Sequence, residues 1–176
     1  NAALEVMAEV INENRGHQLE AICFSAAMHG LIAVAKNGEP LTNMITWADQ
    51  RSSEYAAKLR QSPIARKLYE RTGTPIHPMS PLCKLMWMKD NLPEVFNAAY
   101  KFISIKEFIF FHLFDEYIVD RSIASSTGLF DIYALDWNKD ALDAAGIDAG
   151  RLSRHVDSMH ILHGMKPGFA SRFGIN

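Results

Sequence analysis

Asn37 and Gly38 separate two apolar runs, and this pair constrains the fold more than any other local feature of the chain. The first run covers Gly30 to Ala35 and the second covers Leu41 to Trp47. Asn-Gly between apolar runs is the strongest short-range signal for a β-hairpin, because both residues readily adopt the positive φ angles of the turn. The sequence therefore predicts two antiparallel strands joined by a tight turn.

Two further segments precede this hairpin. Apolar residues recur at helical spacing over residues 2–14, which predicts a helix that is ended by Gly16. The short run from Ala21 to Ala27 is mostly apolar, and we expect it to form a buried strand. A helix, a buried strand and a hairpin in this order indicate an α/β domain with a mixed sheet.

From residue 50 onward the composition favours helices. A Ser-Pro pair is typical of a helix N-cap followed by proline at the first helical position. The chain contains no internal repeat and no linker rich in Gly, Ser or Pro. We therefore expect residues 1–176 to form one compact unit. The expected elements are a helix over residues 50–60, helices opening at Ser62-Pro63 and Ser80-Pro81, a short helix from Leu92-Pro93, a strand over 102–105, a buried helix over 107–114, a helix capped by Asp136 or Asn138 and ended by Gly146, and a last helix from Pro167 to Gly174.

Composition narrows the class of protein. At 176 residues and 48% hydrophobic, the chain can bury one core. Its formal net charge of -2 argues against a nucleic-acid partner, because binding backbone phosphates needs a basic face. The longest apolar stretch, Phe108 to Phe114, is far shorter than the roughly 20 residues of a membrane-spanning helix, so no membrane partner is expected. Two distant cysteines, Cys23 and Cys83, favour a reduced, cytoplasmic protein.

Side chains that can contact a ligand follow two of the apolar runs. Met28 and His29 come directly after the first expected strand, and Trp47 and Asp49 come at the end of the second hairpin arm. Ligand contacts gather at strand ends in open α/β sheets, so two such ends indicate one small-molecule site. A carboxylate can accept hydrogen bonds from neighbouring hydroxyls, and an indole can pack on the C–H face of a polyol.

Each of these residues also has a purely structural interpretation. Asp49 is of the residue type that caps helices, and Trp47 of the type that fills cores. A histidine such as His29 is more often a satisfied core residue than a ligand contact, although a neutral imidazole can donate to a hydroxyl or carboxylate. Spacing alone leaves both interpretations open.

Three other segments deserve a chemical interpretation. Residues 72–81 hold three prolines and one glycine, so this stiff loop suits a pocket wall or a plain connector. The small polar segment from Asp120 to Gly128 suits close helix packing or a cleft lining, and no glycine-rich phosphate loop occurs in the chain. His155, His160 and His163 invite a metal site, but no Cys, Asp or Glu at helical spacing completes one, so no metal is expected.

Taken in order, these motifs resemble the N-terminal domain of the FGGY carbohydrate kinases, and the resemblance covers essentially the whole chain. Within that family, these sequence motifs are most similar to those of the bacterial gluconate kinases. The motifs that carry the resemblance are Ser25-Ala26-Ala27-Met28-His29-Gly30, Ile45-Thr46-Trp47-Ala48-Asp49-Gln50-Arg51, Arg71-Thr72-Gly73-Thr74-Pro75-Ile76-His77-Pro78-Met79 leading to Lys84 and Trp87, Asp120 to Gly128, and Leu135-Asp136-Trp137.

The resemblance implies both a fold and a site. The implied fold is part of a ribonuclease-H-like α/β N-terminal domain of the actin-like ATPase superfamily, in which ATP and sugar meet in the cleft between two domains. The implied sugar contacts are Met28 and His29, the pocket walls Trp47 and Asp49, Met79 reaching in from the proline loop, and His77 beside it.

The chain also departs from the family pattern. The family begins with a strand that carries an Asp-x-Gly phosphate-loop motif, and its catalytic Asp opens a second domain; neither is matched here. The chain opens on an amphipathic pattern without an initiator Met, as a cut inside a larger protein would. We therefore expect a fragment with the sugar side of the site and no catalytic base, while ATP and Mg²⁺ bind mainly to segments outside it.

The expected activity of the intact protein is ATP-dependent phosphorylation of the terminal hydroxyl of D-gluconate, which gives 6-phosphogluconate. One alternative is an FGGY kinase for xylulose, ribulose or glycerol, and another is a non-catalytic sugar-binding module. A metal hydrolase that uses the C-terminal histidines is the third. Homodimers are frequent among such kinases, although no residue pattern here indicates one.

Overall fold

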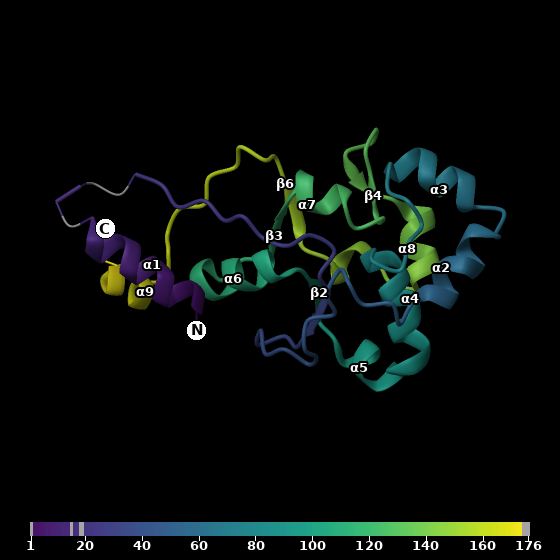
Figure 1. Ribbon diagram of the computed structural model, residues 1–176, viewed down its shortest axis with the longest axis horizontal. Helices are drawn as coiled ribbons and strands as arrows, with labels where there is room; N and C mark the ends of the chain where they lie inside the picture. Colours follow the sequence, from purple (N-terminus) through teal and green to yellow (C-terminus); the bar gives the residue numbers. More distant parts are fainter. Residues whose placement is uncertain (1, 15, 18–19, 174–176) are drawn as a thin grey trace.

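The computed structural model describes residues 2–14, 16–17 and 20–173, and its outline is elongated (Figure 1). Helices α1 (Ala2–Glu13) and α9 (Pro167–Phe173) pack against each other at one end, and a larger body holds the remaining elements. Two irregular segments, residues 20–27 and 157–166, connect this helix pair to the body. The opening helix is confirmed, and no residue of α1 is buried.

The core of the body is built around helix α4 (Pro81–Asn91), which has Ser80 at its N-cap and proline in its first turn, as predicted. Leu82, Leu85 and Met88 of this helix are fully or almost fully buried. Helices α2 (Ser53–Arg60), α5 (Pro93–Ala98) and α8 (Lys139–Ala145) pack against it. Burial of these aliphatic side chains is the main source of stability in this body.

Strands in the described part of the chain form three two-stranded sheets rather than one continuous sheet. The first two are an antiparallel pair of β1 (Ile32–Val34) with β2 (Lys101–Ile103) and a parallel pair of β3 (Ile118–Asp120) with β6 (Arg154–Val156). The third is an antiparallel pair of β4 (Phe130–Asp131) with β5 (Asp136–Trp137). Both strand directions occur, so the expected mixed α/β character is confirmed.

The predicted turn around Asn37 and Gly38 is confirmed. The Ala35 N–H donates to Glu39 O at 2.8 Å, and Leu31 and Ile45 form an isolated antiparallel bridge farther along the two arms. The second arm forms only isolated bridges, however, and β1 has its regular ladder with β2 instead. The first arm thus keeps isolated bridges with the second arm and forms its regular ladder with a strand from a distant part of the sequence.

The predicted buried strand from Ala21 to Ala27 is wrong. These residues have no regular secondary structure, and their side chains are exposed or half-buried. No described segment pairs with their backbone, so the apolar composition is not enough to make a strand. Phe24 nevertheless packs edge-on against Phe110, with ring centroids 5.4 Å apart.

Several other boundaries differ from the prediction. Helix α3 (Ala65–Thr72) begins after Ile64 rather than at Pro63, because Ser62 bonds back to Leu59 O and closes the preceding turn. Helix α6 (Ile105–Phe114) is mostly half-buried rather than buried. The short helices α7 (Arg121–Ser125) and η1 (Ala149–Arg151) complete the fold, and Asn138 rather than Asp136 caps α8. The predicted end at Gly174 lies outside the described residues.

Candidate functional site

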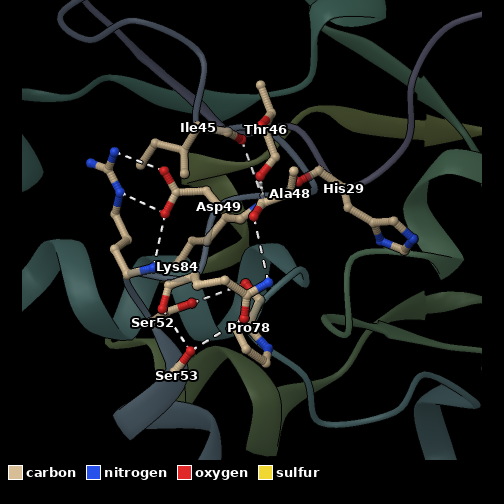
Figure 2. A network of polar contacts seen from close by, with 11 residues as sticks. His29, Ile45, Thr46, Ala48, Asp49, Ser52, Ser53, Pro78 and Lys84 are labelled. Carbon is tan, nitrogen blue, oxygen red and sulfur yellow. Dashed lines mark hydrogen bonds and ion pairs between the residues drawn. The ribbon is translucent and has the colours of Figure 1, made fainter.

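A buried lysine lies where the two ligand-bearing segments meet. Lys84 of α4 has no exposed surface, and its Nζ donates to the backbone oxygens of His29 at 2.5 Å and Thr46 at 2.8 Å. Figure 2 shows His29, Thr46 and Asp49 gathered around this side chain. Burial lowers the pKa of Lys84 to about 8. The ammonium therefore joins two segments that are separate in sequence.

The first segment, Met28–His29, turns sharply before β1. His29 has a φ of 62°, in the left-handed region, and its ring Nδ1 lies 2.9 Å from Ser126 O. A carbonyl oxygen can only accept, so Nδ1 carries the proton and Nε2 is left as an acceptor. Burial lowers the pKa of His29, which keeps the imidazole neutral near pH 7. Met28 beside it remains 36% exposed.

In the second segment, Asp49 is held by Arg51, two residues further along the chain. Asp49 Oδ1 accepts from the Arg51 backbone N–H at 2.9 Å and from Arg51 Nε at 2.8 Å, while Arg51 Nη2 lies 2.8 Å from Oδ2. The hydrogen bond from the Arg51 side chain is the main reason that the pKa of Asp49 is lowered. The Arg51 guanidinium in turn stacks on Trp87, 4.8 Å from the ring centroid. Asp49 is thus an oriented, ionised carboxylate.

Two of the structural interpretations of this segment are wrong. Asp49 is not the cap of the following helix, because Ser52 occupies the N-cap position of α2. Trp47 is not a core residue, because it is 59% exposed. The segment therefore presents an exposed indole two residues before an oriented carboxylate.

The third segment is the proline loop, and one hydrogen bond attaches it to the residues that follow the second segment while another stabilises the loop itself. The Ser52 hydroxyl donates to Pro78 O at 2.9 Å, and the Met79 N–H donates to His77 Nδ1 at 3.2 Å (Figure 2 shows the first). Burial is the main reason that the pKa of His29 is lowered, and the charge of His77 adds to this lowering. His77 is exposed and Met79 is half-buried.

The structure therefore brings together the three segments that carry all six predicted sugar contacts. A small, mostly apolar cavity lies beside them, and its lining includes His29, Ser126, Thr127 and Trp137. Of the six, only His29 is part of that lining. The segment from Asp120 to Gly128 contributes both to the cavity lining and, through Ser126, to the orientation of His29.

Sequence reasoning missed the residues that organise this site. The sequence shows Lys84 and Arg51 only as members of family motifs, yet in the structure they hold the His29 and Asp49 segments. One sequence feature does indicate a special role for Lys84: it is the one charged residue in the apolar stretch from Pro81 to Met88. A lysine in such a stretch is buried only when its ammonium finds partners, which marks it for attention.

The C-terminal histidines do not come together in a metal site. Across residues 2–14, 16–17 and 20–173, no group of three or more His, Cys, Asp or Glu side chains could hold a metal ion. His155 Nε2 instead lies 3.1 Å from Asp136 Oδ1, and His160 and His163 are exposed. Both cysteines are unpaired, and no helix in the same residues is long and apolar enough to cross a membrane.

Comparison with known proteins gives a consistent picture. Residues 1–176 match the family described as "FGGY family of carbohydrate kinases, N-terminal domain". The chain is 42% identical over 175 residues to a gluconokinase from Bacillus licheniformis, covering 99% of this chain and 34% of the relative. A crystal structure of gluconate kinase from Lactobacillus acidophilus superposes with a TM-score of 0.94 at 32% identity, covering 99% of this chain and 35% of that one.

A ligand-bound xylulose kinase from Lactobacillus acidophilus is similar to the same degree. It superposes with a TM-score of 0.94 at 32% identity and covers 99% of this chain and 36% of that one. The chain thus spans about a third of the length of the curated relatives that it matches.

Proposed function

The chain belongs to the FGGY family of carbohydrate kinases, and from this premise we propose that residues 1–176 supply the sugar-binding side of an ATP-dependent gluconate kinase. The membership and the structural neighbours confirm the predicted fold class, a partial ribonuclease-H-like α/β domain of the actin-like ATPase superfamily. The reaction transfers the γ-phosphoryl group of ATP to the terminal hydroxyl of D-gluconate and yields 6-phosphogluconate and ADP. The identity to gluconokinases supports the choice of sugar.

One observation carries the proposal: the segments of Met28–His29, Trp47–Asp49 and His77–Met79 meet around Lys84 and Ser52. His29 Nε2 can accept from a hydroxyl of the sugar, because Nδ1 is occupied by Ser126 O. Asp49 is already ionised and oriented by Arg51, so its remaining lone pairs can accept from two neighbouring hydroxyls.

Apolar side chains complete the proposed pocket. Trp47 offers an exposed indole face for the C–H side of the carbon chain, and Met28 and Met79 offer adaptable thioethers nearby. His77 is exposed on the proline loop, and in the proposed site its imidazole contacts the sugar acid. Phosphoryl transfer depends mainly on positioning and charge stabilisation, and this part of the protein does the positioning.

ATP and Mg²⁺ belong to the proposed reaction but not to the residues described here. The chain has no glycine-rich phosphate loop, and its described residues contain no cluster of carboxylates and histidines suited to a metal. We therefore propose that nucleotide, Mg²⁺ and the base that removes the hydroxyl proton reside chiefly outside this part. A cytoplasmic location, where ATP is supplied, and a homodimer remain predictions; gel filtration of the full-length protein tests the latter.

A substrate panel on the full-length kinase tests the function. D-gluconate, xylulose, ribulose and glycerol are compared by kcat/KM with ATP and Mg²⁺, and we expect gluconate to be preferred. Preference for another of these sugars reassigns the substrate within the family. ATP-independent sugar binding without turnover supports a non-catalytic module instead.

The Asp49→Ala variant tests the site in the same assay. Loss of a charge-assisted hydrogen bond raises the KM for gluconate about tenfold or more, with the KM for ATP unchanged. Asp143→Ala removes a carboxylate from an exposed i,i+4 pair with Lys139 and is the matched control. An unchanged gluconate KM in folded Asp49→Ala limits Asp49 to holding Arg51.

A further inference from the structure

Lys84 is an unusual buried charge, because its partners are backbone oxygens. Its side chain has no exposed surface, and Nζ lies 2.5 Å from His29 O, 2.8 Å from Thr46 O and 3.4 Å from Ile45 O. No described carboxylate forms an ion pair with it, and Asp49 acts on it only through its charge. A buried ammonium is costly unless its donors are used, and here three N–H groups meet three acceptors.

The ammonium lies where regular strand pairing stops. Leu31 and Ile45 exchange backbone hydrogen bonds of 3.0 and 2.9 Å, and this is the last bridge between the two arms on the side of the site. On the side of the site, no further bridge joins the two arms in the described residues, and His29 is in the left-handed region. Lys84 binds the oxygens of His29 and Thr46 just past the bridge. Its ammonium therefore links the two arms at a point where no backbone hydrogen bond joins them.

We propose that Lys84 is a positioning residue of the sugar site, whose ammonium fixes the spacing between the Met28–His29 segment and the Trp47–Asp49 segment. This inference rests on the proposed function, because it assigns those two segments to one sugar. An anchored His29 oxygen fixes the backbone from which the imidazole projects, and an anchored Thr46 oxygen fixes the start of the turn that carries Trp47. Lys84 itself does not touch the sugar.

The connection depends on the protonation of Lys84. An ammonium has three N–H donors, whereas a neutral amine has two and directs a lone pair at the third oxygen. The charged and titratable groups that act on it are Asp49 and Arg51 from the preceding loop, Cys83 from α4 and His29 from the first segment. With burial lowering the pKa to about 8, the third hydrogen bond is lost in mildly alkaline solution.

The test uses the full-length kinase with three substitutions. Lys84→Met keeps the length and removes the donors, Lys84→Arg keeps both charge and donors, and Lys89→Met changes an exposed lysine on the same helix. Sugar KM, ATP KM and kcat are measured from pH 7 to 9.5, and amide hydrogen exchange is followed at Leu31 and Ile45.

We expect Lys84→Met to raise the sugar KM about tenfold or more with the ATP KM unchanged. The wild-type sugar KM rises above about pH 8, this rise is absent in Lys84→Met, and Lys84→Arg recovers part of the affinity. The amides of Leu31 and Ile45 exchange faster in Lys84→Met, while Lys89→Met matches the wild type in every measurement.

A folded Lys84→Met enzyme with wild-type sugar KM overturns the proposal. If Lys84→Met does not fold, Lys84→Gln takes its place in the same measurements, and a wild-type sugar KM in that folded variant overturns the proposal. If the wild-type protein phosphorylates no sugar, the proposed function fails; hydrogen exchange then decides on the connection alone, and unchanged exchange at Leu31 and Ile45 in Lys84→Met refutes it.

Discussion

At the scale of single residues, the site consists of side chains whose protonation is set by their surroundings. His29 is half-buried, and burial holds its pKa below the ordinary value of 6.5. Between the lowered pKa and 6.5, the unfolded chain binds more protons than the folded chain. The stability that this residue contributes is therefore fully present above about pH 6.5 and is lost as the pH falls through the lowered pKa.

His29→Asn tests this linkage, because asparagine tolerates the left-handed backbone at this position. We expect the free energy of unfolding in urea to fall less between pH 7 and pH 5 in this variant than in the wild type. His112, whose pKa burial also lowers, is present in both proteins and cancels in the comparison. Equal losses in the two proteins would show that His29 does not contribute to the acid sensitivity.

How much of the site the sequence reveals depends on the kind of residue. His29 and Asp49 are visible because reactive side chains follow apolar runs, and the segments that carry them do meet. Lys84 and Arg51 act through hydrogen bonds to backbone and carboxylate oxygens that are distant in sequence or depend on an exact turn. Hydrophobic periodicity contains no information on such contacts, so it does not reveal the roles of these two residues.

At the scale of elements, the turn at Gly38 joins the hairpin to α6. Gly38 has a φ of 84°, and a Cβ at this position would overlap the ring of Phe111. Gly38→Ala therefore combines backbone strain with a steric clash, and we expect it to lower the free energy of unfolding by about 1–3 kcal/mol. Gly168→Ala in α9, where an added Cβ meets nothing within 4 Å, is the control. Equal urea midpoints for the two variants would contradict this explanation.

Elements were predictable where local chemistry decides and not where a partner decides. The cap of α8 at Asn138, the proline start of α4 and the turn at Gly38 depend on neighbouring residues, and all three are present. Residues 21–27 needed a neighbouring strand, and no described segment pairs with them. Strand pairing is a non-local property, which a single apolar run does not encode.

At the scale of the whole molecule, Arg151 connects the C-terminal third to the core. Its Nη2 donates to Phe96 O and to Ala99 O, and its guanidinium lies 4.8 Å from the Phe96 ring centroid and 4.6 Å from that of Phe102. Burial lowers the pKa of this guanidinium. One side chain from η1 thus donates hydrogen bonds to carbonyl oxygens at the end of α5 and packs on two aromatic rings.

We expect Arg151→Met to lower the free energy of unfolding by about 2–3 kcal/mol, because two carbonyl oxygens lose their donor and two cation–π contacts are lost. Arg154→Met removes an exposed pair with Glu116 and should change it by about 0.5 kcal/mol or less. Urea unfolding with an unchanged m-value measures both effects. Similar losses in the two variants would remove the special role of Arg151.

The choice of backbone oxygens as the partners of Lys84 has a consequence for how such a site can change. The main-chain oxygens at positions 29, 45 and 46 are present whatever the side chain, provided that the residue at position 29 tolerates a positive φ. In the proposed sugar site, the frame is therefore made of main-chain atoms and does not depend on the side chains that face the ligand. Exchanging side chains at positions 28, 47 or 49 leaves the hydrogen bonds of Lys84 in place.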